Sequence, residues 1–180
     1  MEIERKEISG LIEFFPKIFG DSRGFFLESF HAERYSEILG DINFVQDNMS
    51  SSLRGVLRGL HFQKPPYTQG KLVSVIQGSV LDVAVDLRKN SPTYGQHETV
   101  LLSGAKKNQF WVPEGFAHGF VALEDHTIFC YKCTNYYHPE AEETILWNDR
   151  TLQIDWQIDS PVISEKDKNG LLFSDFETPF

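Results

Sequence analysis

Residues 71–87 read Lys-Leu-Val-Ser-Val-Ile-Gln-Gly-Ser-Val-Leu-Asp-Val-Ala-Val-Asp-Leu, and this stretch decides the fold class. Aliphatic and β-branched side chains fill both halves, and the Gln77-Gly78 pair between them is a turn signal. The stretch therefore predicts two strands, at 71–76 and 80–87. Because side chains alternate along a strand, the apolar residues at odd positions of 80–87 share one face, while Asp82 and Asp86 share the other.

The same strand signals recur along the rest of the chain. Further short strands are predicted at residues 11–15, 56–62, 99–102, 109–112, 119–122, 127–134 and 144–147. A helix is predicted from Phe30 to Leu39, with Gly40 as its stop, and a second helix start at Ser164, whose side chain would cap it. Many short, closely spaced strands predict an all-β fold, an antiparallel sandwich or barrel of jelly-roll type, with a few short helices.

Composition limits the function classes. The 180 residues fit one domain spanning 1–180, with 41% hydrophobic and 24% charged residues. The net charge of -9 argues against a general nucleic-acid or anionic-membrane binder, but leaves room for a local basic pocket for a phosphorylated small molecule. No apolar run is long enough to span a membrane, and the first residues lack the apolar core of a secretory signal. With only two cysteines, we expect a cytoplasmic protein.

A first candidate cluster is Arg54-Gly-Val-Leu-Arg58-Gly59-Leu-His61-Phe-Gln. On a regular strand, Arg58 and His61 point to opposite faces. A single bulge near Gly59 would bring both side chains to the same face. The residues alone leave two interpretations open: a binding site, or an exposed arginine pair beside a structural histidine.

A second cluster, Pro113-Glu-Gly115-Phe-Ala-His118, matches one half of the two-part signature of cupin barrels, in which the histidine binds a metal. The other half needs His-x-His followed by a glutamate, but the chain has His61-Phe62-Gln63 and a lysine, Lys71, near the glutamate position. Catalytic metal sites usually take three or more protein ligands. The pattern therefore predicts a cupin-shaped barrel that binds no metal.

The run Cys130-Tyr131-Lys132-Cys133 has the spacing of a redox motif but lies in a strand-like segment. Positions three apart on a strand face opposite ways, so the two sulfurs are not expected to pair, and both cysteines are expected to be buried. Tyr131 shares a face with Phe129 and Cys133.

Two further segments are ambiguous on their own. Asp21–Glu28 is a turn followed by an apolar run with Arg23 and Glu28 at its ends, which also suits a surface salt bridge. Phe44–Ser51 is polar at alternate positions, which suits ligand contacts inside a barrel and, almost equally, a solvent-facing edge strand.

The clusters taken in order resemble the dTDP-4-dehydrorhamnose 3,5-epimerase family, which are metal-free, cupin-like sugar epimerases. The matching motifs span nearly the whole chain: Asp21-x-Arg-Gly-Phe-Phe, Phe44-Val-Gln-Asp-Asn48, Arg54 to Gln63, Gln69-Gly-Lys-Leu-Val73, Asp82 to Arg88, Ser91-Pro-Thr-Tyr-Gly95, Val112 to Phe120, Tyr131-Lys-Cys-Thr134, Trp147-Asn-Asp149 and Ser164-Glu-Lys-Asp167.

The resemblance implies epimerisation at C3 and C5 of dTDP-4-dehydro-6-deoxy-D-glucose, with no cofactor. It implies that His61 is the base and that Asp167 orients it. Lys71 would stabilise the C4 enolate, and Tyr131 would return the proton from the opposite face.

The resemblance also implies binding roles. Arg23 and Arg58 match diphosphate ligands. The remaining matches are the nucleotide contacts Glu28, Gln46 and Asn48, and the substrate-pocket residues His118, Glu142 and, as a weaker match, Lys166. Since homologous enzymes exchange N-terminal segments, a homodimer is expected in which residues 1–45 contribute to the interface, and Arg23 and Glu28 serve the neighbour's site.

The chain departs from the family pattern at Ser74, where arginine is usual, and at Arg150 and Gln157, where proline is usual. Two other functions therefore stay open: an epimerase acting at C3 or C5 alone on another deoxysugar nucleotide, and a non-catalytic nucleotide-sugar-binding cupin. A metal-dependent cupin oxygenase is disfavoured because ligands are missing.

Overall fold

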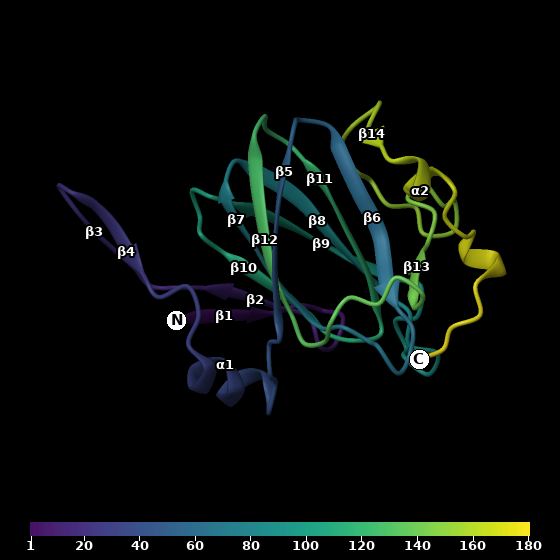
Figure 1. Ribbon diagram of the computed structural model, residues 1–180, viewed down its shortest axis with the longest axis horizontal. Helices are drawn as coiled ribbons and strands as arrows, with labels where there is room; N and C mark the ends of the chain where they lie inside the picture. The colour runs from purple at the N-terminus through teal and green to yellow at the C-terminus, as the bar shows by residue number, and fades with distance from the viewer.

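Two antiparallel sheets packed face to face form the body of the protein in the computed structural model, which describes residues 1–180 (Figure 1). The first sheet, in spatial order, contains β1 (Glu2–Arg5), β2 (Ile12–Phe15), β10 (Gln109–Val112), β7 (Lys71–Gln77), β12 (Thr127–Cys133) and β5 (Gln46–Ser52). The second contains β13 (Glu142–Thr144), β6 (Val56–Gln63), β11 (Phe116–Ala122), β8 (Ser79–Asp86) and β9 (His97–Ser103), with the short β14 (Val162–Ile163) parallel to β6. This arrangement is the cupin-like β fold that the sequence predicts.

The turn at Gln77-Gly78 carries the chain from one sheet to the other. The two strands of residues 71–87 are confirmed, but β7 and β8 do not pair with each other, since each belongs to a different sheet. Gly78 has φ of +78°, and a Cβ there would lie 2.4 Å from Thr127 Oγ1. Glycine at this position lets the chain pass close to β12 as it crosses between the sheets.

Strand β8 is buried on both faces. Val80 and Ala84 join the apolar cluster between the sheets, whereas Val83 and Val85 join a second cluster on the outer face of the second sheet. The alternation predicted for this strand is confirmed. The outer cluster is covered by the C-terminal segment, so Asp82 and Asp86 lie on a strand that no solvent reaches.

The outer face of the first sheet is partly covered by α1 (Ala32–Leu39). Tyr35 of this helix stacks on Phe14 with ring centroids 4.9 Å apart, and both side chains are buried. The helix begins two residues later than predicted and ends at Gly40, as expected from the chain pattern. The uncovered part of this face lies over β5, β7 and β12, where Met49 and Ile76 are exposed.

Two predicted elements near the C-terminus have different outcomes. The strand predicted at 144–147 is wrong except for its first residue, because β13 ends at Thr144 and Ile145 then forms a bridge with Leu171. The helix start is confirmed. Helix α2 (Glu165–Lys168) begins after Ser164, whose Oγ accepts a hydrogen bond from the Asp167 amide at 3.1 Å, and the 3-10 helix η1 (Phe173–Asp175) follows.

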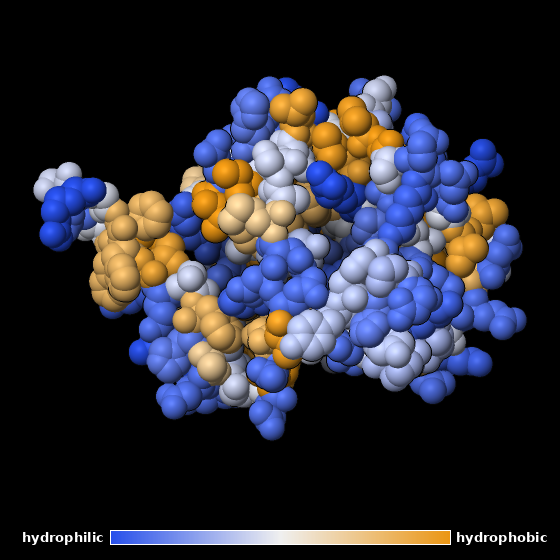
Figure 2. All heavy atoms as spheres, viewed as in Figure 1, coloured by the Kyte–Doolittle hydropathy of each residue, from blue (hydrophilic) through white to orange (hydrophobic).

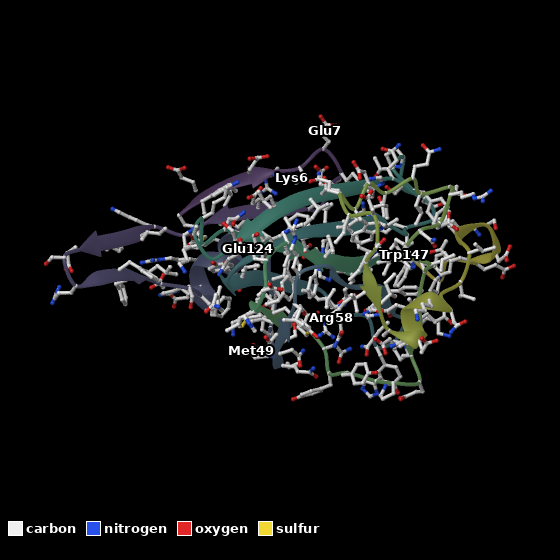
Figure 3. The ribbon with its side chains drawn as sticks, turned by 90° about the horizontal axis from the view of Figure 1, so that it is seen from above. Lys6, Glu7, Met49, Arg58, Glu124 and Trp147 are labelled. Carbon is white, nitrogen blue, oxygen red and sulfur yellow. The ribbon has the colours of Figure 1, made fainter.

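A two-stranded ribbon projects from the body: β3 (Ile18–Asp21) paired with β4 (Gly24–Leu27) (Figures 1 and 3). The sequence indicates only a turn and an apolar run in this segment. In the structure, β3 and β4 pair with each other and with no strand of the two main sheets. Phe19, Phe25 and Phe26 are each more than half exposed, and the ribbon shows hydrophobic colours in Figure 2. An isolated ribbon with exposed aromatic rings lacks support from its own chain. No helix in the structure has the length and apolar character needed to cross a membrane.

Candidate active site

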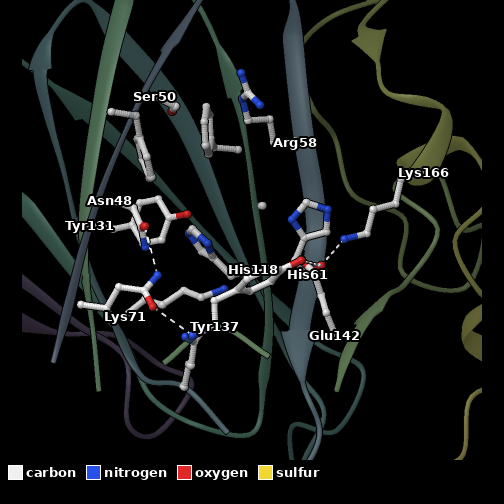
Figure 4. A pocket seen from close by; sticks show the side chains of 15 residues that line it. Asn48, Ser50, Arg58, His61, Lys71, His118, Tyr131, Tyr137, Glu142 and Lys166 are labelled. Atoms are coloured by element: carbon white, nitrogen blue, oxygen red, sulfur yellow. Dashed lines mark hydrogen bonds and ion pairs between the residues drawn. The ribbon is translucent and has the colours of Figure 1, made fainter. Parts of the chain in front are cut away.

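A cavity of about 380 Å³ lies between the two sheets (Figure 4). Side chains reach it from β5, β7 and β12 of the first sheet and from β6, β11 and β13 of the second. The cavity brings together most of the predicted site residues: Gln46, Asn48, Arg58, His61, Lys71, His118, Tyr131, Glu142 and Lys166. Asp167 contacts this group through His61.

The bulge that would bring Arg58 and His61 to one face is present in β6. Arg58 pairs with Phe120 and His61 with His118, so three steps along β6 face two steps along β11. Gly59 has φ of +136°, and a Cβ on it would lie 2.6 Å from Gly119 Cα. The close approach of these two glycines accommodates the extra residue. Arg58 and His61 consequently both face the cavity.

Ser52 on β5 orients Arg58. Its hydroxyl oxygen accepts a hydrogen bond from Arg58 Nε at 3.3 Å. The two terminal nitrogens of the guanidinium form no hydrogen bond or ion pair with other residues. They are therefore free to donate to an anion in the cavity.

His61 is paired with a buried carboxylate. Its Nε2 lies 2.6 Å from Oδ1 of Asp167, which is only 3% exposed. Burial acts to raise the pKa of Asp167, but the hydrogen bond and charge of His61 outweigh it, and the pKa lies below its ordinary value. Since an ionised carboxylate only accepts hydrogen bonds, His61 donates through Nε2, and its Nδ1 has no partner in the protein.

Lys71 is the cation at the base of the cavity, and it forms no ion pair or hydrogen bond within the chain (Figure 4). Burial lowers the pKa of the ammonium below its ordinary value of 10.5, and the nearby Cys133 and Glu142 partly offset this effect. Since no side chain takes up its hydrogen bonds, the ammonium group is free to donate to a ligand in the cavity, although Glu142 and Asp82 lie near enough to influence its pKa.

Tyr131 enters the cavity from the wall opposite His61, because β12 and β6 belong to different sheets (Figure 4). Burial raises the pKa of its phenol above 10.0, and nearby Cys133 and Glu142 raise it further. The phenol consequently keeps its proton at neutral pH. Its hydroxyl has no hydrogen-bond partner in the protein.

The rim of the cavity is held by a cluster around Glu142. Lys166 forms an ion pair with this carboxylate, and the Tyr137 hydroxyl donates to its Oε2 at 2.7 Å. The hydrogen bond to Glu142 raises the pKa of Tyr137 to about 12. Sequence reasoning missed Tyr137, since it sits in an exposed aromatic loop with no pattern that separates it from Tyr136.

The structure does not bring Arg23 and Glu28 to the cavity of their own chain. Arg23, at the end of the ribbon, pairs with Asp21 at 2.6 Å. Glu28, where the ribbon leaves the body, pairs with Arg34 at 2.5 Å. Neither residue lines the cavity.

The two cysteines are free, as predicted, but only Cys133 is buried. The expectation that both are buried is wrong for Cys130, which is half-buried because it faces the partly uncovered side of the first sheet. Asn48 Nδ2 lies 3.6 Å from Cys133 Sγ, on the cavity side of β12. No group of three or more His, Cys, Asp or Glu side chains is placed to hold a metal ion.

Similarity to known proteins extends over nearly the whole chain. A sequence model of the family described as dTDP-4-dehydrorhamnose 3,5-epimerase matches residues 5–175. A dTDP-4-dehydrorhamnose 3,5-epimerase from Shigella flexneri is 51% identical over 176 residues, which cover 97% of each chain. A crystal structure of a Legionella pneumophila dTDP-6-deoxy-D-glucose-3,5-epimerase in complex with dTDP-4-keto-L-rhamnose has a TM-score of 0.94 and 53% identity, covering 98% of this chain and 94% of that chain.

A cupin-like sandwich with an imidazole–carboxylate pair, a free ammonium group and a phenol in its cavity defines an isomerase of the nucleotide-sugar epimerase class. Acid and base on opposite walls are what proton removal and return on two faces require. The chain belongs to the dTDP-4-dehydrorhamnose 3,5-epimerase family. A dTDP-4-dehydrorhamnose 3-epimerase from Streptomyces niveus is also similar, at 38% identity over 97% of this chain and 85% of the relative.

Proposed function

We propose that this protein epimerises C3 and C5 of dTDP-4-dehydro-6-deoxy-D-glucose, giving dTDP-4-dehydro-L-rhamnose for dTDP-L-rhamnose biosynthesis. The observation that carries the proposal is the placement of His61, paired with Asp167 at 2.6 Å, on the wall opposite Tyr131. Lys71 supplies a free cation in the same cavity. A base, an acid and an electrophile are the groups that this reaction needs.

His61 removes the proton in each epimerisation. The C4 ketone acidifies the hydrogens at C3 and C5, and the Nδ1 lone pair of His61 accepts one of them. The imidazolium that forms is stabilised by the Asp167 carboxylate, which stays ionised because its pKa is lowered. The electron pair of the broken C–H bond moves into an enolate whose charge lies on the C4 oxygen.

Lys71 stabilises that enolate oxygen. An ammonium group between the two sheets, where the surroundings are less polar than bulk water, interacts more strongly with a developing charge than it would in bulk solvent. Since Lys71 has no anionic partner in the chain, its hydrogen bonds are available to the substrate. The lysine thus takes the place of an electrophilic metal ion in the reaction.

Tyr131 returns a proton to the opposite face of the same carbon, which inverts the configuration. The raised pKa of the phenol keeps the proton on the oxygen until the enolate carbon accepts it. The reaction leaves a phenolate at Tyr131 and an imidazolium at His61. Exchange with water through the open cavity restores both groups before the second carbon reacts.

The other predicted residues bind the nucleotide sugar. Arg58, oriented by Ser52, contacts the diphosphate, for which a guanidinium fork is well suited. Gln46 and Asn48, hydrogen-bonded to each other at 3.1 Å, contact the nucleotide. His118, Glu142 and Lys166 complete the pocket around the sugar.

The protein acts as a homodimer in this proposal, with residues 1–45 forming much of the interface. The exposed rings of Phe25 and Phe26 on the ribbon support it, because contiguous exposed apolar surface marks an interaction site. Arg23 and Glu28, which lie outside their own cavity, would reach the partner's cavity. A cytoplasmic location stays a prediction of the sequence.

Proton exchange followed by NMR tests the function. The purified protein is incubated with dTDP-4-dehydro-6-deoxyglucose in deuterated water containing EDTA. Deuterium at both C3 and C5 is the expected result for a metal-free double epimerase. Label at one carbon alone would identify a single-site enzyme. This alternative is relevant because the similar Streptomyces niveus protein is named a 3-epimerase. Absence of label despite binding would indicate a nucleotide-sugar-binding protein.

A further inference from the structure

The cavity contains a second imidazole–carboxylate pair beside the first. His118 on β11 is directly paired with His61 on β6, so the two rings lie on neighbouring strands. His118 Nε2 lies 2.9 Å from Oδ1 and 3.0 Å from Oδ2 of Asp82, on the adjacent strand β8. Asp82 has no role in the proposed function.

Asp82 is an unusual residue for its place in the fold. It is fully buried, and it lies on the same face of β8 as Val80 and Ala84, which belong to the apolar cluster between the sheets. His118 is the only side chain that donates a hydrogen bond to its carboxylate. A buried carboxylate paired with an imidazole is a poor stabilising device, because apolar side chains of similar volume fill such a place without a desolvation cost. Stability alone therefore does not explain why an aspartate and a histidine occupy these two positions.

The geometry fixes which nitrogen of His118 carries the hydrogen. A carboxylate accepts hydrogen bonds, so the hydrogen shared with Asp82 is on Nε2. The other nitrogen, Nδ1, has no hydrogen-bond partner in the chain and is not among the buried polar atoms that lack one. It is consequently open to the cavity, which His118 lines.

We propose that Asp82 is a positioning residue that holds His118 with Nε2 protonated, so that Nδ1 accepts a hydrogen bond from a hydroxyl group of the bound sugar. This inference rests on the proposed function for the identity of the sugar. Without the carboxylate, the ring is free to rotate or to carry its hydrogen on Nδ1, and that nitrogen no longer accepts. A ring fixed in advance also loses less freedom on binding.

The test uses Asp82→Asn in the full-length protein. An asparagine side chain keeps the shape but offers an NH₂ group, which donates to Nε2 and favours the ring form with hydrogen on Nδ1. The form is read directly from the ¹⁵N NMR signals of labelled histidine at pH 8, with the His118→Asn variant used to assign the signals. We expect hydrogen on Nε2 in the original protein and a shift toward Nδ1 in Asp82→Asn.

The kinetic part measures kcat and KM for the 4-keto sugar nucleotide and the Kd of dTDP. For Asp82→Asn we expect kcat/KM to fall by about 10- to 100-fold, the effect of a lost buried hydrogen bond, while the Kd of dTDP changes less than twofold. Asp86→Asn is the matched control. It changes another fully buried aspartate of β8, whose partners are Arg88, Ser91 and Thr93 outside the cavity. It should lower the melting temperature without altering the His118 signals or kcat/KM of the folded protein.

Three results would overturn the proposal. One is hydrogen on Nδ1 of His118 in the original protein, which is measurable even if Asp82→Asn does not fold. Another is an unchanged kcat/KM in a variant whose NMR signals show the altered ring. The third is an equal loss of activity in Asp86→Asn, which would mean that any buried charge of β8 has this effect. The NMR measurement needs no substrate. If the protein is not an epimerase, the NMR signals would still show hydrogen on Nε2 of His118, but the 4-keto sugar nucleotide would not be turned over.

Discussion

The cavity and the ribbon β3–β4 both carry residues that the sequence places in the site, yet their surroundings differ. In the cavity, two of the predicted site residues are held by side chains of their own chain, His61 by Asp167 and Arg58 by Ser52, and the bulge at Gly59 places both on one face. On the ribbon, Arg23 and Glu28 contact only neighbouring surface charges, and the aromatic rings are exposed. Under the proposed function, this difference would mean that the chemistry is built within one chain, whereas part of the binding depends on a second chain.

The substitution His61→Ala tests the role of the cavity most directly. Loss of the base should reduce deuterium incorporation at both C3 and C5 by about 10⁴-fold, the upper range for general base catalysis, with little change in the Kd of dTDP. NMR of the exchange reaction measures this effect. His126→Asn is a suitable control, because His126 is exposed and its φ of 54° suits asparagine. Full exchange in His61→Ala would show that the base is another residue.

Lys71→Met removes the cation but keeps the length of the side chain. Since the enolate oxygen would lose its charge partner, kcat should fall by about 10²- to 10³-fold. Steady-state kinetics with the 4-keto sugar nucleotide measure the change. A variant in which KM rises and kcat is preserved would mean that Lys71 only binds the substrate.

The pH profile separates Lys71 from Tyr131. Burial lowers the pKa of Lys71, so its positive charge is present at neutral pH and is lost as the pH rises through a value below 10.5. Burial raises the pKa of Tyr131, so the phenol loses its proton only above 10.0. We expect kcat to decline on the alkaline side through Lys71, and Lys71→Arg to move this decline to higher pH. An unchanged alkaline limb in Lys71→Arg would assign it to another group.

Tyr131→Phe should separate exchange from inversion. The base still removes a proton and returns it to the same face, so deuterium enters at least one carbon, while formation of the epimer falls by about 10²-fold or more. NMR of the sugar distinguishes label without inversion from label with inversion. Normal inversion in this variant would show that another donor reaches the opposite face.

The ribbon side is tested by Arg23→Ala, for which the smallest effect is expected. Loss of a charge-assisted hydrogen bond to the diphosphate should raise KM by about tenfold, with kcat largely kept. Mixed dimers of Arg23→Ala and His61→Ala subunits, made by co-expression with two affinity tags, then show which cavity the arginine serves. If it serves the partner, one of the two cavities regains both residues and the activity of that site returns. If it serves its own chain, both cavities stay defective.

Much of the fold is predictable because strands and turns leave local signals. Residues 109–112 form a strand with the bounds that the sequence indicates, and the Ser164 cap identifies α2. The strand predicted at 144–147 fails because the chain leaves β6 after Ile145, which still exchanges backbone hydrogen bonds with Leu60; the Leu146 amide donates to Leu171 instead, and Trp147 packs against the outer cluster. An apolar run is buried both when it forms a strand and when it packs as an irregular segment, so hydrophobicity alone does not distinguish the two.

The sequence identifies most of the residues of the candidate site but not all of their contacts. The sequence shows that Arg58 and His61 can share a face only with a bulge near Gly59, and the structure contains that bulge. Tyr137 and Asp82 escape sequence reasoning because their places in the site depend on side-chain contacts: Tyr137 with Glu142, five residues away, and Asp82 with His118, 36 residues away. A tyrosine in a loop and an aspartate in a strand carry no local sign of such contacts.

The pairing of His61 with Asp167 has a consequence for how the protein is made. The two residues lie 106 positions apart, and every strand of both sheets precedes Asp167 in the chain. During synthesis the strands of both sheets therefore leave the ribosome before the carboxylate that pairs with His61. The histidine–carboxylate pair forms only after the strands have been made, and a polypeptide that stops short of α2 carries His61 without its partner.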